Sequence, residues 1–250
     1  MGIAKFTESL TRGLLMFNQE QLLIALALFL VTILIFVFSL LSIPGILFFS
    51  NDIERVLPLP VKPFEIIIAK IIAATSTQYL ISLFFLISII IGYILCVPVD
   101  IFFIFKMIVA LVLFPIVPAL LASIFVILLV KFSGFLKNQD QYNIFIMICS
   151  FIFLAFYYIF IFNNGFEETQ MIDLIIKGGN SLVTLLGTFL PHIAFLIEFI
   201  FQNNILSFLI FLIINLIVFA LAILIAQKYY LAGALKVNNI ASNKTKFSSK

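Results

Sequence analysis

The sequence predicts an all-α polytopic membrane protein with five transmembrane helices and a broken external helical segment. Composition is the first reason: 64% of the residues are hydrophobic and 10% are charged, against about 45–50% and about 25% in soluble domains. Length is the second, because several apolar runs exceed the roughly 18 residues that indicate a membrane-spanning helix. The short alternating strands typical of a transmembrane barrel do not occur in the sequence.

The apolar runs predict one transmembrane domain over residues 1–235, followed by a polar, disordered cytoplasmic tail over residues 236–250. A further apolar segment at 181–201 contains Pro191, His192 and Glu198, and we expect a re-entrant or interfacial helix there. We expect five spans, near residues 22–49, 66–97, 101–130, 144–162 and 205–226.

The distribution of basic residues predicts the orientation of these spans. If residues 51–70 are cytoplasmic, ten of the fourteen Lys and Arg residues lie inside. The other four lie outside, at Lys5, Arg12, Lys106 and Lys177. The C-terminus is then cytoplasmic. Five spans therefore require either an external N-terminus or a preceding helix, and we expect the chain to be part of something larger.

The segment between the first two apolar runs, NDIERVLPLPVKPFEIIIAK at residues 51–70, concentrates six charged residues and three prolines. Asn51 or Asp52 can cap a short helix. Pro58 and Pro60 forbid its continuation. The predicted shape is a short surface helix followed by a stiff elbow, which a partner could push. The alternative is a solvated turn whose charges only keep it out of lipid.

The same segment predicts how the next helix begins. Pro63 suits the first helical turn, where its missing N–H costs nothing. Glu65 falls in that turn, where the helix dipole favours an anion. Lys70 lies about two turns further on, and we expect its side chain to extend back to the membrane interface.

Three segments resemble bacterial type 2 ABC exporter permeases. FFSNDIERVLPLPVKPFEIIIAK, at residues 48–70, is similar to the family's acidic pair, its LPLP and the EI…AK that starts the next helix. Residues 113–140, with Pro115 and Pro118, resemble its proline-bracketed helix and basic cytoplasmic loop. Residues 187–200 resemble its external segment. The sequence departs from the family in lacking a helix before residues 22–49 and any second half.

The resemblance implies the transmembrane subunit of an ATP-driven exporter in the bacterial cytoplasmic membrane. Its partners would be a separate ATP-binding subunit, which holds ATP and magnesium, and a second permease chain or half that completes a dimer. In the family, the loop that matches residues 51–70 contacts the ATPase. This implies a coupling role for Asp52, Glu54, Arg55, Pro58, Pro60, Pro63, Glu65 and Lys70.

Motifs for catalysis are absent from the sequence. It has no Gly-x-x-x-x-Gly-Lys-Ser/Thr, His-Glu-x-x-His, Cys-x-x-Cys or Gly-x-Ser-x-Gly pattern, so we expect no ATPase, metal or catalytic site in this chain. His192 is interpreted as a packed or interfacial histidine, and Glu198 as an interfacial residue. Asn215 is expected to form an interhelical hydrogen bond. The sequence does not identify a substrate path.

Other functions stay open on sequence alone. A secondary transporter or channel is one alternative, although such proteins usually show repeats or charged residues within the spans. A non-functional fragment of a larger permease is another. An intramembrane enzyme would need paired polar groups at depth, and the sequence offers almost none.

Overall fold

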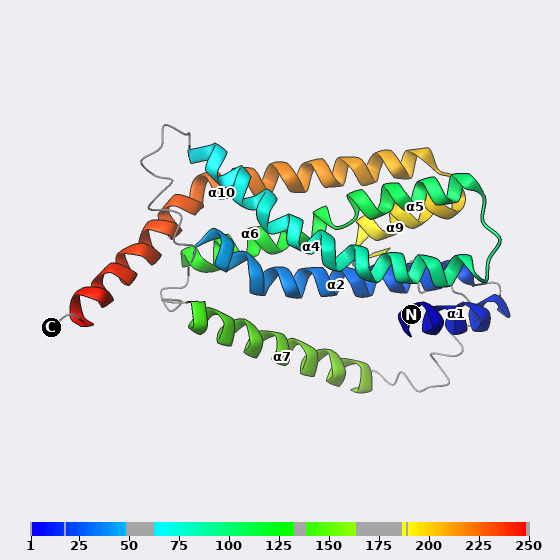
Figure 1. Cartoon of the computed structure of the whole chain (residues 1–250), viewed down its shortest axis with the longest axis horizontal. Helices are drawn as coiled ribbons and strands as arrows, with labels where there is room; N and C mark the ends of the chain where they lie inside the picture. Colours follow the sequence, from blue (N-terminus) through cyan, green and yellow to red (C-terminus); the bar gives the residue numbers. More distant parts are fainter. Residues whose placement is uncertain are drawn as a thin grey trace. The chain divides into compact units, whose positions relative to one another are not determined.

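The computed structural model describes residues 2–17, 19–48, 63–132, 139–163, 187–188 and 190–248. Its elements in this part of the chain are α-helices, and no strand occurs among these residues (Figure 1). In chain order the helices are α1 (Gly2–Leu15), α2 (Glu20–Leu47), α4 (Pro63–Ile94), α5 (Ile101–Leu113), α6 (Ile116–Phe132), α7 (Gln139–Asn163), α9 (Pro191–Gln202) and α10 (Ile205–Ser248).

Four stretches of the described helices are long and apolar enough to cross a membrane, as expected for a helical membrane protein. α7 covers the fourth predicted run, residues 144–162, as a helix but is not among these four, so its crossing of the membrane stays a prediction. The four candidate spans are Gln21–Leu47, Glu65–Ile94, Ile101–Lys131 and Ile205–Tyr230.

The third of these spans is built from two helices. Asp100 caps α5, where its side chain accepts a hydrogen bond of 2.8 Å from the backbone N–H of Phe103. The helical hydrogen-bond ladder is interrupted at Pro115, because proline has no N–H to continue it, whereas Phe114 keeps helical dihedral angles. Pro118 falls in the first turn of α6, where a missing N–H breaks no helical bond.

α2 also contains a proline, but the helix continues past it. Pro44 has no N–H, so the carbonyl of Leu40 lacks its usual donor four residues on. The helix ends one turn later at Leu47, and the N–H of Phe48 still donates to the carbonyl of Pro44 at 2.8 Å.

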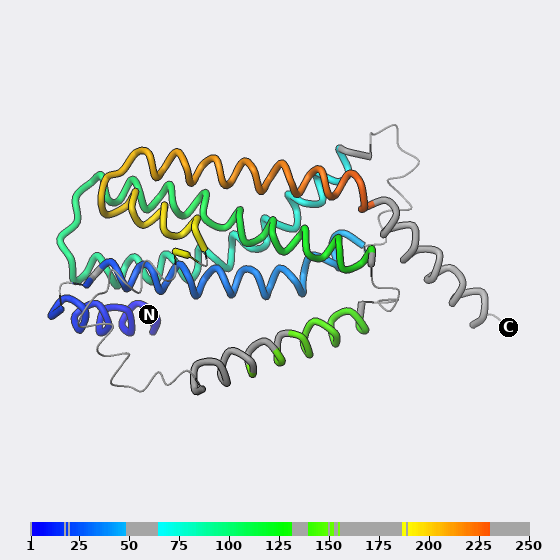
Figure 2. Tube along the Cα trace, turned by 180° about the vertical axis from the view of Figure 1, so that it is seen from behind, coloured from blue at the N-terminus to red at the C-terminus, as the bar shows by residue number. Residues whose placement is uncertain are grey.

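α9 is too short to cross a membrane. Its 12 residues extend about 18 Å at the α-helical rise, less than the roughly 30 Å of a hydrocarbon core. The helix stops at Asn203, whose φ of 55° and ψ of 27° are left-handed, and the chain turns at once into α10 (Figure 2). The re-entrant placement of 181–201 stays a prediction, and residues 181–186 lie outside the described residues.

The chain divides into two compact units. Unit 1 contains Met1–Ile35, Tyr79–Val117 and Tyr157–Leu216; unit 2 contains Phe36–Gln78, Pro118–Phe156 and Ile217–Lys250. Counted from the sequence, unit 2 has ten basic and four acidic residues, a formal net charge of +6. Unit 1 has four basic and seven acidic residues, a net charge of −3. The four basic residues of unit 1 are those that the sequence places outside.

α10 is helical to Ser248, where the sequence suggested a disordered tail over residues 236–250. Extending an existing helix fixes one residue per hydrogen bond and avoids the cost of nucleation. Residues 231–248 also contain no proline to stop the helix.

Candidate functional site

Most of the predicted coupling segment lies outside the described residues, but its C-terminal part, residues 63–70, is described. Pro63 is the first residue of α4, and Glu65 is exposed in its first turn, so both sequence predictions for this helix start are confirmed. The residues whose placement is not described are Asp52, Glu54, Arg55, Pro58 and Pro60.

Lys70 is buried, with 6% of its surface exposed, and the extension of its side chain to the membrane interface stays a prediction. Its Nζ donates a hydrogen bond of 3.2 Å to the carbonyl oxygen of Ile46. Ile46 belongs to the last turn of α2, where carbonyls have no partner within the helix and a nearby cation is favourable. The side chain therefore caps the end of α2 from α4.

A second side chain holds the same helix end. The hydroxyl of Tyr230 in α10 donates to the carbonyl oxygen of Leu47 at 2.9 Å, and its ring centroid lies 5.4 Å from that of Phe48. Two consecutive carbonyls of α2 are thus bonded by side chains from two other helices. We call Ile46, Leu47, Lys70 and Tyr230 the α2 clamp.

α6 is joined to α10 next to the clamp. The Nζ of Lys131, in the last turn of α6, lies 3.4 Å from the centroid of the Tyr229 ring, a cation–π contact. Lys228 lies 5.4 Å from the same ring. Within unit 2, side-chain contacts therefore link the end of α2 to α4 and α10, and link α10 to α6.

A further polar contact joins α2 and α4 within unit 2. The Nε2 of Gln78 donates to the Oγ of Ser42 at 2.8 Å, and Gln78 is fully buried. Its Oε1 has no hydrogen-bond partner among the described residues. Hydrogen bonds between helices are favourable in lipid, because no water is present there to bond the polar groups instead.

Lys106 caps the end of another helix in unit 1, as Lys70 does in unit 2. Its Nζ donates to the carbonyl oxygen of Ile200 at 2.8 Å and to Oδ1 of Asn203. These acceptors lie where α9 ends, so the side chain holds that helix end from α5. Sequence reasoning missed the contact because its partners lie 94 or more residues away.

Three polar residues of α9 and α10 have contacts that bear on the sequence predictions. Glu198 is half-buried, and it accepts a hydrogen bond from the hydroxyl of Ser207 across the turn between the two helices. His192 is 3% exposed and its ring lies 6.0 Å from that of Phe114, which confirms a packed histidine. The interhelical bond predicted for Asn215 is wrong, since its Nδ2 donates at 2.9 Å to Phe211 of its own helix.

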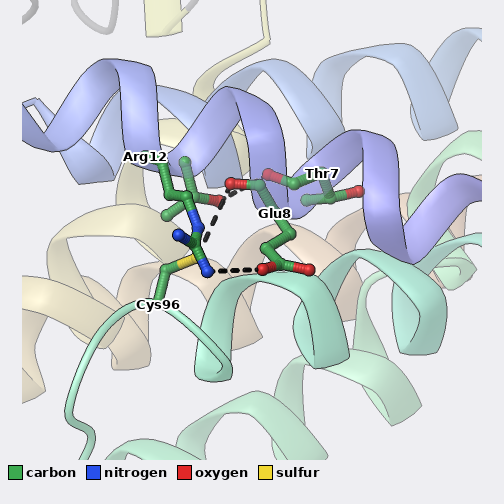
Figure 3. A network of polar contacts seen from close by, with 5 residues as sticks. Thr7, Glu8, Arg12 and Cys96 are labelled. Carbon is green, nitrogen blue, oxygen red and sulfur yellow. Dashed lines mark hydrogen bonds and ion pairs between the residues drawn. The ribbon is translucent and has the colours of Figure 1, made fainter.

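α1 is docked against the end of α4 within unit 1 (Figure 3). Thr7 is buried on this side, and the Sγ of Cys96 lies 3.5 Å from the carbonyl oxygen of Glu8. A Cβ added to Gly92 would lie 2.7 Å from the Cβ of Thr7, so only glycine permits this approach. The guanidinium of Arg12 bonds the Glu8 carboxylate at 2.7 Å, which raises the pKa of Arg12 above its usual value.

Comparison with known proteins identifies no relative. No protein-family model matches the chain, and no curated protein and no solved structure matches it. Among the described residues, no group of three or more His, Cys, Asp or Glu side chains could hold a metal ion.

Proposed function

We propose that the chain is the transmembrane subunit of an ATP-driven exporter of the type 2 ABC class. A separate ATP-binding subunit, carrying ATP and magnesium, moves it through residues 51–70. A second permease chain or half completes the dimer in the bacterial cytoplasmic membrane. The resemblance of residues 48–70 to the family's coupling loop supports this proposal, and the clamp at the base of that loop supports it from the structure.

The α2 clamp is the observation on which the proposal depends most. The segment leaves α2 after Leu47 and reaches α4 at Pro63, so a force on it acts on both helix ends. Lys70 bonds these two helices to each other, and Tyr230 bonds the end of α2 to α10. A push on the segment is therefore shared by three helices, as a coupling element requires.

The charge distribution supports the cytoplasmic placement of the segment. Unit 2 contains Leu47 and Pro63, on either side of the undescribed part of the segment, and ten of the fourteen Lys and Arg residues, against four in unit 1. Positive charge is retained on the cytoplasmic side of membrane proteins. We therefore place residues 51–70 and the C-terminus in the cytoplasm, where an ATP-binding subunit can reach them.

Co-purification from membranes tests the proposal. The double variant Glu54→Lys and Arg55→Glu exchanges two charges within the coupling segment. Glu8→Lys with Arg12→Glu is the matched control, because it makes the same exchange in α1, at an ion pair of unit 1. We expect a protein that is photolabelled by azido-ATP to co-purify with the parent chain and the control but not with the coupling variant.

Two results would contradict the proposal. One is no ATP-binding protein with any of the three chains, each present at equal amounts in the membrane. The other is transport that persists without ATP and stops when an ion gradient is collapsed, which is the behaviour of a secondary transporter.

A further inference from the structure

Three candidate spans end close together in unit 2. The α2 span ends at Leu47 and the α10 span at Tyr230, and these two residues share the hydrogen bond of 2.9 Å. The span that includes α6 ends at Lys131, whose ammonium group contacts the ring of Tyr229. Tyrosine and lysine collect where a membrane meets water, because each has an apolar body and a polar tip. This end of unit 2 therefore lies at the headgroup level of one membrane surface.

Two lysines from different helices lie beside one ring at this level. The Nζ of Lys131 is 3.4 Å from the centroid of Tyr229, and the Nζ of Lys228 is 5.4 Å from it. The two ammonium groups are thus at most about 9 Å apart, so an anion placed between them is attracted by both. The sequences of α6 and α10 contain no Asp or Glu. We call Lys131 and Lys228 the cation pair.

An apolar stripe of α10 leads to the cation pair. Positions 217, 221, 224 and 228 are spaced four, three and four residues apart, so they lie on one side of the helix. Ile217, Leu221 and Leu224 are 52%, 46% and 60% exposed, and Lys228 is exposed as well. The stripe rises about 16 Å, roughly half of a 30 Å hydrocarbon core. It therefore has the length of one leaflet, and the cation pair lies at its end.

We propose that the ends of α6 and α10 in unit 2 bind an anionic phospholipid. The headgroup lies between the ammonium groups of the cation pair, and one acyl chain lies along the apolar stripe of α10. Basic side chains between helix ends at a membrane surface bind anionic headgroups in this way. Phosphatidylcholine would bring a quaternary ammonium group to the same place, so the site should prefer a lipid with a net negative charge, such as phosphatidylglycerol. The proposal does not depend on the transport function.

A tryptophan on the apolar stripe reports which lipid lies there, because the chain has no tryptophan of its own. Leu224→Trp is one turn before Lys228, and Phe84→Trp, at a 62% exposed site of the α4 span in unit 1, is the reference position. Each full chain is reconstituted in vesicles of phosphatidylcholine and phosphatidylglycerol with the same acyl chains. Only one of the two lipids is brominated on its acyl chains at a time, and quenching of the tryptophan is measured.

Charge variants in the Leu224→Trp chain then test the cation pair. Lys131→Gln with Lys228→Gln removes the pair. Lys5→Gln with Arg12→Gln is the matched control, because it removes two positive charges from unit 1. Both double variants lose the same net charge, so a difference between them comes from where the charges lie. Quenching by brominated phosphatidylcholine shows that α10 of each variant lies in the bilayer.

We expect phosphatidylglycerol to quench the tryptophan at position 224 several-fold more than phosphatidylcholine at equal mole fraction, in the parent and in the matched control. The two lipids should quench it equally in the variant without the cation pair, and should quench position 84 equally. Inorganic phosphate should reduce the preference no more than chloride of the same ionic strength.

Four results would overturn the proposal. Equal quenching by both lipids at position 224 of the parent would mean that the stripe is ordinary lipid-facing surface. The same preference in both double variants, or its loss in both, would mean that the cation pair has no specific role. Displacement of the lipid by inorganic phosphate would indicate a site for a soluble anion. If neither lipid quenches position 224 while both quench position 84, a protein covers the stripe instead.

Discussion

The ammonium group of Lys70 lies 3.2 Å from the carbonyl oxygen of Ile46 and caps the end of a neighbouring helix. The same device recurs in unit 1, where Lys106 bonds the carbonyl of Ile200 at the end of α9. Backbone groups in a membrane must be satisfied by the protein, because lipid offers no hydrogen bonds. A lysine with three donors at a helix C-terminus provides them and also complements the helix dipole.

Tyr230→Phe should uncouple transport from ATP hydrolysis if the α2 clamp transmits movement. The substitution removes one hydroxyl from the carbonyl of Leu47 and keeps the ring against Phe48, at a cost of about 1 kcal/mol in stability. Tyr79→Phe is the control, since it removes a similar bond to the carbonyl of Val112 in unit 1. Both variants should unfold at similar temperatures, but only Tyr230→Phe should lower transport per ATP hydrolysed. Equal effects of Tyr230→Phe and Tyr79→Phe on transport would show that the α2 clamp has no part in coupling.

Lys70→Glu should destabilise the protein by about 3–5 kcal/mol, because it puts an anion against the carbonyls at the end of α2 in a buried site. Lys228→Glu makes the same charge change at an exposed position of unit 2 and should have little effect. Unfolding in detergent, followed by circular dichroism, measures the difference. Similar stability of the two variants would show that Lys70 is accessible to water.

Gly92→Ala should displace α1 from α4. The new methyl carbon would lie 2.6 Å from the carbonyl oxygen of Ala4, which is backbone and cannot move without the helix. Overpacking of this kind costs about 1–3 kcal/mol. Gly13→Ala is the control: a Cβ there meets nothing within 4 Å, and alanine should stabilise α1 by about 0.5–1 kcal/mol. Hydrogen exchange of residues 2–15 should rise in the first variant and not in the second.

Asn203 should contribute to stability through both its backbone and its side chain, and two variants separate the parts. Asn203→Gly keeps the left-handed backbone but removes the acceptor for Lys106, at a cost of about 1 kcal/mol. Asn203→Ala loses the same acceptor and adds roughly 1 kcal/mol of backbone strain. Thermal unfolding should therefore rank the wild type above glycine and glycine above alanine. Equal values for the two variants would show that the turn relaxes away from its left-handed conformation.

The sequence predicts where helices begin and break better than it predicts which helices meet. Pro63 and Glu65 mark the start of α4, and Pro115 marks the break in the third span, because proline acts through its own backbone. Apolar length predicts five spans, of which four are candidate spans in the structure, for the same local reason. In a membrane, however, the side of a helix that faces lipid and the side that faces protein are both apolar. The hydrophobic pattern of the sequence therefore does not show which side packs against other helices.

The contacts of the candidate site could not be predicted for that reason. Tyr230 and Leu47 are 183 residues apart, and Lys106 and Ile200 are 94 apart. One signal was present: Lys70 lies two turns inside an apolar run, where an ionisable residue is expected to have a specific partner. The position of Lys70 indicated a role, but only the fold shows that the partner is the preceding helix.

The proline in α2 changes how strain spreads from the clamp. Because Pro44 removes the hydrogen bond to Leu40, the final turn of α2 is attached to the helix before it by a weakened backbone. The same turn is tied to α4 and α10 through its last two carbonyls. The last turn of α2 is therefore attached flexibly to the rest of α2. A force on this turn displaces α4 and α10 more readily than it bends the rest of α2. Under the proposed coupling function, a force on residues 51–70 reaches α4 and α10 through the side chains of Lys70 and Tyr230 rather than along α2.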